Sequence, residues 1–236
     1  MGTRHLTLVK NEEGEIKVAQ YGQWDGYPSG QGVNILKFCA DKENSYWKNL
    51  SMLKMMLKRV YFVENNEIIK KWYNEKYLPA AQSTPDLRTN NMKFWWNYFC
   101  SRDLGSDILY NIVNLDGLQR SSDVRPVGAQ LPEEFQNYLF LHDKSTFLLD
   151  SLMCEYAYCI NFQTNKLEVY VGFNKDINAE AELCKTIRNL YYTQDNQVKQ
   201  QEFYGCSLIK EYDLCNLPSE EDFVKELEKY EEQRWN

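Results

Sequence analysis

The stretch YGQWDGYPSGQG combines backbone freedom, aromatic surface and one acid between an expected strand and an expected helix. Glycines just before a helix allow backbone N–H groups to approach an anion, because no Cβ blocks the approach. The aromatic rings offer stacking surfaces, and the acid offers a polar anchor. The stretch is therefore a candidate ligand-binding loop. Its candidate residues are Trp24, Asp25, Tyr27, Gly30 and Gly32.

The same stretch has a purely structural interpretation. It can be a strand-to-helix turn whose glycines take positive φ angles and whose aromatic side chains close the core. Its spacing matches neither a Walker loop nor a dinucleotide fingerprint, and it contains no lysine. Asp25 would also repel a phosphate. The spacing alone favours the turn.

A second group of charged residues lies in otherwise apolar or turn segments. Arg4 falls on the first expected strand, and Arg102 with Asp103 falls at the start of an expected helix. Such places can form a buried polar site, so we hypothesise that these three residues meet Asp25 in space. The alternative is that Arg102 and Asp103 only pair with each other and cap the helix.

Other familiar chemistries lack their residues. There is no GxSxG nucleophile elbow, and His142 is the only histidine next to an acid, so acid and base roles stay unassigned. Seven cysteines form no CxxC pair, and the chain has only two histidines. We expect buried, reduced thiols, no metal site and no cofactor.

Charge and hydropathy restrict the partners and the compartment. A net charge of −7 argues against nonspecific nucleic-acid binding, which needs a surplus of clustered basic residues. No apolar run reaches the roughly 20 residues that span a bilayer, and the N-terminus lacks the order of a signal peptide. These patterns predict a cytoplasmic protein with no membrane contact.

Hydrophobic periodicity predicts an α+β fold. Residues 3–21 and 154–173 each read as two alternating strands around a turn, which indicates an antiparallel hairpin near each end of the chain. We expect both hairpins in one mixed sheet or in two stacked sheets, with helices packed outside and residues 1–236 forming one domain. Helices are expected at residues 33–40, 45–60, 104–113 and 179–192, a late strand at 206–212, and long loops at 77–91 and 116–132. A last helix is expected behind PSEED, where Ser219 with Asp222 resembles a capping box.

Several segments resemble a family of uncharacterised proteins from bacteria and their phages. They are MGTR, KVAQYGQWDGYPSGQG, SRDLGSDIL and EYAYCINFQTNKLEVYVGF. The resemblance spans most of the chain, and the loop motif is specific. It implies a single domain, and it implies no particular reaction.

A weaker resemblance is to the N-terminal nucleophile hydrolases, which also begin with a strand, a tight hairpin and an acid-bearing loop. Those enzymes use a Cys, Ser or Thr that becomes the first residue. Removal of Met1 exposes Gly2, which carries no nucleophile, and Thr3 would serve only after a second cleavage.

Two functions of different class follow. The first is a non-catalytic interaction protein, phage-linked, that engages a protein partner such as a host defence or nucleic-acid-handling factor. A tyrosine- and tryptophan-rich surface favours this hypothesis, because these side chains bury large area at small entropy cost. The second is a small-ligand-binding protein, or a hydrolase with an N-terminal-nucleophile-like fold, that uses the loop from Trp24 to Gly32.

Overall fold

The computed structural model describes residues 2–41, 49–77, 104–114, 135, 138–192 and 202–234. Most of the expected loop at 77–91, all of the one at 116–132, and both Arg102 and Asp103 lie outside these ranges. The strands are β1 (His5–Lys10), β2 (Ile16–Gly22), β3 (Val60–Phe62), β4 (Leu139–Leu141), β5 (Tyr156–Asn161), β6 (Lys166–Val171) and β7 (Ser207–Asp213). The α-helices are α1 (Val33–Ala40), α2 (Asn49–Met56), α3 (Glu67–Trp72), α6 (Asp107–Val113), α8 (Glu182–Tyr191) and α9 (Glu220–Arg234). The short 3₁₀ and π turns are η1 (Pro28–Gly32), η2 (Leu57–Arg59), η3 (Val63–Asn65), η4 (Tyr73–Tyr77), η8 (Ser145–Leu149) and η9 (Ile177–Ala179).

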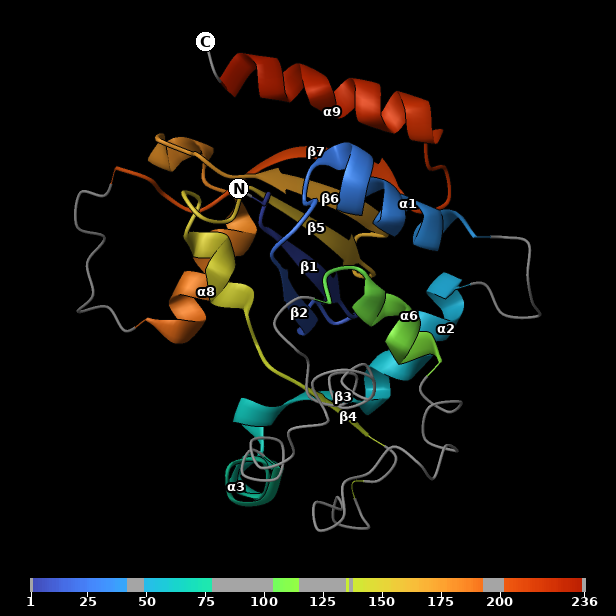
Figure 1. Cartoon of the computed structure of the whole chain (residues 1–236), viewed down its shortest axis with the longest axis vertical. Helices are drawn as coiled ribbons and strands as arrows, with labels where there is room; N and C mark the ends of the chain where they lie inside the picture. Colours follow the sequence, from blue (N-terminus) through green and yellow to red (C-terminus); the bar gives the residue numbers. More distant parts are fainter. Residues whose placement is uncertain are drawn as a thin grey trace.

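The main sheet joins the two expected hairpins. Its strand order is β2-β1-β5-β6-β7, and only the central pair, β1 with β5, is parallel. Strands β3 and β4 form a separate parallel pair beside the β2 edge of the main sheet (Figure 1). The expected α+β fold with hairpins in a mixed sheet is therefore confirmed.

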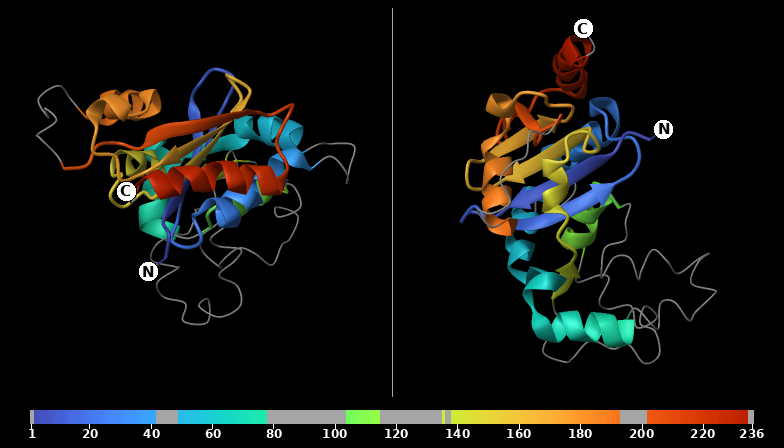
Figure 2. Two further views of the ribbon diagram at one scale, coloured as in Figure 1. Left: turned by 90° about the horizontal axis from the view of Figure 1, so that it is seen from above. Right: turned by 90° about the vertical axis from the view of Figure 1, so that its left-hand side faces the viewer.

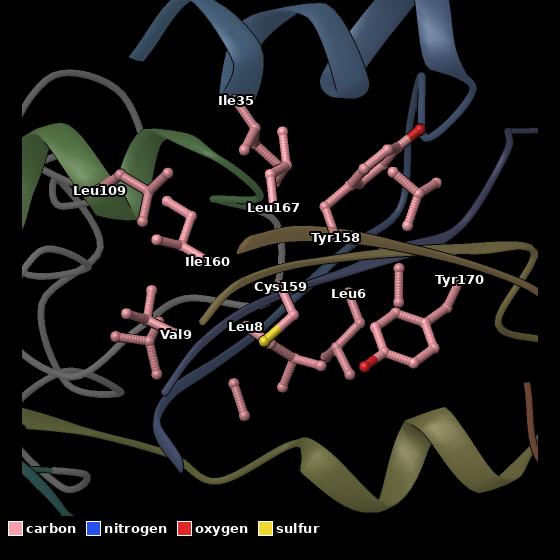
Figure 3. Packing of buried hydrophobic residues seen from close by; sticks show 14 of the residues in the cluster. Leu6, Leu8, Val9, Ile35, Leu109, Tyr158, Cys159, Ile160, Leu167 and Tyr170 are labelled. Carbon is pink, nitrogen blue, oxygen red and sulfur yellow. The ribbon is translucent and has the colours of Figure 1, made fainter. Parts of the chain in front are cut away.

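Helices cover both faces of the main sheet. Helix α1, the η1 turn and α9 lie together over one face, and η8 with α8 lies over the other (Figures 1 and 2). In Figure 3, Tyr158 and Leu167 point towards α1, whereas Leu8 and Cys159 point to the opposite side. Because successive side chains of a strand alternate between faces, β1 and β5 contribute to two apolar layers at once.

Strand β1 is buried on both faces, although its sequence indicated burial of one face. Leu6 and Leu8 share one face of β1 and both are buried, as their alternation indicates. His5 and Thr7 share the other face, and they are buried too. Helix α1 and the glycine-rich loop cover this second face. In a sheet with one solvated side, the same face would be exposed to water.

Helix ends differ from expectation where tertiary pairing intervenes. The helix expected up to residue 60 ends at Met56, because Val60 leaves the η2 turn and pairs with Leu139 in the small parallel sheet. Helix α6 begins at Asp107, three residues after the expected start, and the side chain of Ser106 bonds to Gln31 in place of capping the helix.

Helix α9 begins as the sequence indicates. The Ser219 hydroxyl accepts a hydrogen bond from the Asp222 N–H at 3.1 Å and donates to the Asp222 carboxylate at 2.7 Å. These bonds satisfy a backbone donor that the first turn cannot pair internally. Phe223 and Leu227 then bury the inner face of the helix.

We expect α9 to be an integral part of the core. Phe223 is fully buried, and its ring centroid lies 5.2 Å from that of Tyr212 on β7. Phe223→Ala should lower the free energy of unfolding by about 3–5 kcal/mol, because it removes a large buried ring. Lys225→Ala, at an exposed position of the same helix, should change it by less than about 0.5 kcal/mol in the same urea titration. Equal effects of the two substitutions would contradict this packing.

Candidate functional site

The glycine-rich loop is fastened to the sheet by backbone hydrogen bonds. The Gly26 N–H donates to the Thr3 carbonyl at 2.9 Å, just before β1. The Tyr158 hydroxyl on β5 donates to the Gly26 carbonyl at 2.8 Å. Both bonds hold one glycine between the first strand and the centre of the sheet, so the loop has a fixed path over the α1 face.

Within the loop, two glycines fit against neighbouring backbone and core. A Cβ on Gly30 would lie 2.3 Å from the Asp25 carbonyl oxygen, and a Cβ on Gly32 would lie 2.9 Å from the Tyr158 hydroxyl. Their N–H groups donate to the Tyr27 carbonyl at 3.0 and 3.4 Å. These two N–H groups are therefore already paired inside the loop.

The aromatic and acidic side chains of the loop face outwards. Trp24 is 59% exposed and Tyr27 is 38% exposed. The Tyr27 hydroxyl donates to the Asp25 carboxylate at 3.2 Å, and this bond to an anion raises the pKa of Tyr27. Gly2 approaches so closely that a Cβ there would lie 2.1 Å from the indole ring of Trp24. We call Trp24, Asp25 and Tyr27 the loop surface.

Asp25 itself has a left-handed backbone, with φ of 56°. This conformation is uncommon outside glycine, and aspartate is among the residues that tolerate it best. The Asp25 carbonyl accepts a hydrogen bond from the Gln31 N–H at 2.8 Å, which closes the loop on itself. Backbone strain of this kind concentrates at functional sites.

Arg4 lies next to the loop but pairs elsewhere. Its backbone N–H donates to the Glu155 carboxylate at 3.1 Å, and its Nε lies 3.8 Å from the same oxygen. Its carbonyl accepts bonds from the N–H groups of Glu155 and Tyr156 at 3.2 and 3.3 Å. Arg4 therefore ties the start of β1 to β5. The hypothesis that Arg4, Asp25 and Arg102 meet stays a prediction, since Arg102 lies outside the described residues.

A buried histidine lies beneath the loop, and the sequence analysis did not select it. His5 is 1% exposed, and desolvation lowers its pKa to about 4, although a hydrogen bond to the Thr3 backbone and the Asp25 charge act to raise it. The imidazole is therefore neutral at pH 7. A glycine opposite His5 in the N-terminal hairpin was the available signal, because it leaves room for a ring.

Two glycines pack against this imidazole, and a third packs against the Cβ of His5. A Cβ on Gly22 would lie 2.0, 2.3 and 2.9 Å from Cε1, Nε2 and Nδ1 of His5, so Gly22 packs on the face of the ring. A Cβ on Gly26 would lie 2.7 Å from the His5 Cβ. A Cβ on Gly105 would lie 2.7 Å from Nε2. At Gly22 and Gly105, a side chain larger than hydrogen would overlap the imidazole of His5.

His142 belongs to a separate cluster at the ends of β3 and β4. Its Nδ1 lies 2.8 Å from a carboxylate oxygen of Glu64, and the edge of its ring meets Tyr73. Burial acts to raise the pKa of Glu64, but the bonds from His142 and the Asp143 backbone lower it overall. Tyr191 of α8 donates to Asp143. This arrangement orients an imidazole, and within the described chain no hydroxyl or thiol nucleophile bonds to it.

Burial weakens several of the described thiols as nucleophiles. Burial raises the pKa of the Cys39, Cys159 and Cys184 thiols, which keeps them protonated and poorly nucleophilic. Five of the six described cysteines are buried, as expected, and Cys215 is exposed. Within the described ranges, no three His, Cys, Asp or Glu residues gather closely enough to hold a metal ion. None of the helices there combines the length and apolar composition needed to cross a bilayer.

Comparisons with protein-family models, curated proteins and solved structures gave no match.

The contact between Gly22 and His5 predicts that the effect of Gly22→Ala on stability depends on the imidazole. Gly22→Ala should destabilise the protein by about 1–3 kcal/mol, because the new methyl overlaps the imidazole. In a His5→Ala background, the same substitution should be neutral or stabilising by about 0.5 kcal/mol, since alanine suits a strand better than glycine does. Urea unfolding of the four proteins measures the coupling. Equal effects in both backgrounds would show that the ring does not rest on Gly22.

Burial of His5 also predicts a pH dependence of stability. Its pKa is about 4 when folded and near 6.5 when unfolded, so only the unfolded chain gains a proton between these values. Stability from this group is complete above pH 6.5 and is lost as the pH falls towards 4. Between pH 7 and pH 5, wild type should lose about 2 kcal/mol relative to His5→Gln, which cannot titrate. If the free energies of unfolding of the two proteins fall in parallel as the pH is lowered, His5 is solvated.

Proposed function

We propose that the protein is a non-catalytic interaction protein that binds a protein partner through the loop surface. The exposure of Trp24 carries this proposal. A tryptophan that leaves more than half of its surface in water gains most when a partner covers it. Tyr27 and the Asp25 carboxylate lie beside it in the chain and add a polar handle.

The fixed path of the loop supports binding. Hydrogen bonds to Thr3 and from Tyr158 hold Gly26, and the Asp25 carbonyl holds Gln31. Ordering a loop during association costs free energy, and a loop that is ordered beforehand avoids most of that cost. The close approach of Gly2 likewise restricts the indole of Trp24.

Charge indicates the kind of partner. The chain has a net charge of −7, and Asp25 adds an exposed carboxylate to the loop surface. Opposite charges steer association, so a partner with a basic surface fits best. A host defence or nucleic-acid-handling factor, met by a phage-linked protein, belongs to this class. Direct binding of nucleic acid would require the basic patch that the composition argues against.

The alternative of a hydrolase has less support from the described residues. Burial raises the pKa of the Cys39 and Cys184 thiols, which makes these two groups weak nucleophiles. The alternative of a small-ligand-binding protein uses the same loop, from Trp24 to Gly32, and the exposed Trp24 ring would then stack on the ligand.

The decisive experiment is capture of a partner with the tagged chain, followed by binding measurements on the purified pair. Trp24→Ala should raise the dissociation constant by about 10-fold or more, because it removes a large anchor. Leu190→Ala is the matched control, since Leu190 is 69% exposed on α8 over the other face of the sheet. It should leave the dissociation constant unchanged. Melting curves verify that both variants fold.

Two outcomes would overturn the proposal. One is a partner that binds the Trp24→Ala variant as tightly as wild type, which would place the interface elsewhere. The other is recovery of a stoichiometric metabolite with no protein, which would favour the small-ligand alternative.

A further inference from the structure

One end of the main sheet brings together segments that are far apart in the chain. In the strand registers, His5 lies opposite Gly22 and Tyr156, and Tyr156 lies opposite Val171. The residues just before β1, just before β5 and just after β6 are therefore neighbours at this end. We define the sheet-end surface as Arg4, Leu152, Met153, Glu155 and Phe173.

The turn before β5 gives this surface exposed apolar side chains. Leu152 is 41% exposed and Met153 is 39% exposed. The Met153 sulfur accepts a hydrogen bond from Arg4 Nη1 at 2.7 Å, so the turn contacts the residue that precedes β1. Contiguous exposed apolar side chains of this kind mark interaction sites, whereas single ones scattered over a surface do not.

Phe173 lies beside the same turn and has a strained backbone. Its φ angle is 55°, which is rare for a bulky aromatic residue. Its N–H donates to the Ser151 carbonyl at 2.6 Å, and a Cβ on Gly172 would lie 2.3 Å from the same carbonyl oxygen. These contacts hold the half-buried Phe173 next to Leu152. Strained residues persist where the surrounding structure fixes them, and they cluster at functional sites.

Arg4 and Glu155 form an incomplete ion pair within this surface. Arg4 Nε lies 3.8 Å from Glu155 Oε1, and within the described chain this buried nitrogen has no hydrogen-bond partner. The two side chains are still 27% and 24% exposed. A guanidinium has five N–H donors and a carboxylate has two oxygens, so both groups have capacity for a further charged partner.

These two charges complement each other when the surface meets a copy of itself. A two-fold axis beside the pair places Arg4 of one copy opposite Glu155 of the other, and the reverse contact follows by symmetry. The pair is neutral in sum, so two chains of net charge −7 meet here without like charges in contact. We propose that the sheet-end surface is the interface of a homodimer, in which Arg4 and Glu155 pair across the axis and the apolar turn is covered.

This inference goes beyond the proposed binding of a protein partner. The loop surface, formed by Trp24, Asp25 and Tyr27, is not part of the sheet-end surface, so a dimer would present two loop surfaces. The tests below use the chain alone, and their outcome does not depend on whether Trp24 binds a partner.

The first test is sedimentation analysis of the full chain over a range of concentrations. Wild type should form a dimer with a dissociation constant on the order of micromolar. Met153→Asp should raise this constant by about 30-fold or more, because it buries a charge that has no partner. Ile68→Asp is the matched control, since Ile68 is 58% exposed on α3, far from this end of the sheet (Figure 1). It should leave the constant unchanged. A wild-type chain that stays monomeric up to about 1 mM would overturn the proposal.

The second test exchanges the charges of the pair. Arg4→Glu and Glu155→Arg should each sediment as monomers, because like charges would face each other across the axis. An equimolar mixture of the two variants should form heterodimers, since each contact across the axis then joins opposite charges. Melting curves verify that both variants fold, and the Met153→Asp comparison does not depend on them. The proposal fails if the folded variants remain monomeric when mixed, or if either one alone dimerises as wild type does.

Discussion

The parallel pairing of β1 with β5 is the constraint on which the rest of the structure depends. These strands come from opposite halves of the chain, and their register runs without a break from His5 opposite Tyr156 to Lys10 opposite Asn161. Each strand brings its own antiparallel neighbour, so one contact joins two hairpins into four strands, and β7 adds the fifth by pairing with β6. The pairing also brings Tyr158 under the glycine-rich loop, where its hydroxyl holds Gly26. Loss of this pairing would separate the loop from its support and open both apolar layers.

The sheet face beneath η8 and α8 buries two carboxylates that are paired within the protein. On the η8 and α8 side, the carboxylate of Glu168 is buried, yet it accepts hydrogen bonds from Asn161 at 2.6 Å and from the Tyr170 hydroxyl at 2.5 Å. Glu180 is likewise paired through both oxygens with Arg188. A fully satisfied network stabilises a core, whereas an incomplete one lowers its stability. These two buried carboxylates belong to satisfied networks and therefore stabilise the core beneath η8 and α8.

The glycine-rich loop separates two surfaces with different chemistry. Its outer side exposes an indole, a phenol and a carboxylate, and its inner side rests on a neutral imidazole. The same glycines serve both, because Gly26 lets the loop approach His5 while Gly30 lets the chain fold back over the Asp25 carbonyl.

The sequence by itself determined the local structure. Alternation identified both hairpins, the Ser219 and Asp222 pair marked the start of α9, and the glycines marked the loop, because each pattern depends on neighbouring residues in the chain. Tertiary structure decided the parallel joining of the hairpins, the burial of His5 and the pairing of Arg4 with Glu155. Arg4 and Glu155 are 151 positions apart, and no local pattern encodes such a contact. Strand order, the start of β3 at Val60 and the polar layer beneath the loop arise only when distant segments pack, because packing determines which polar atoms lose water and which regain a partner.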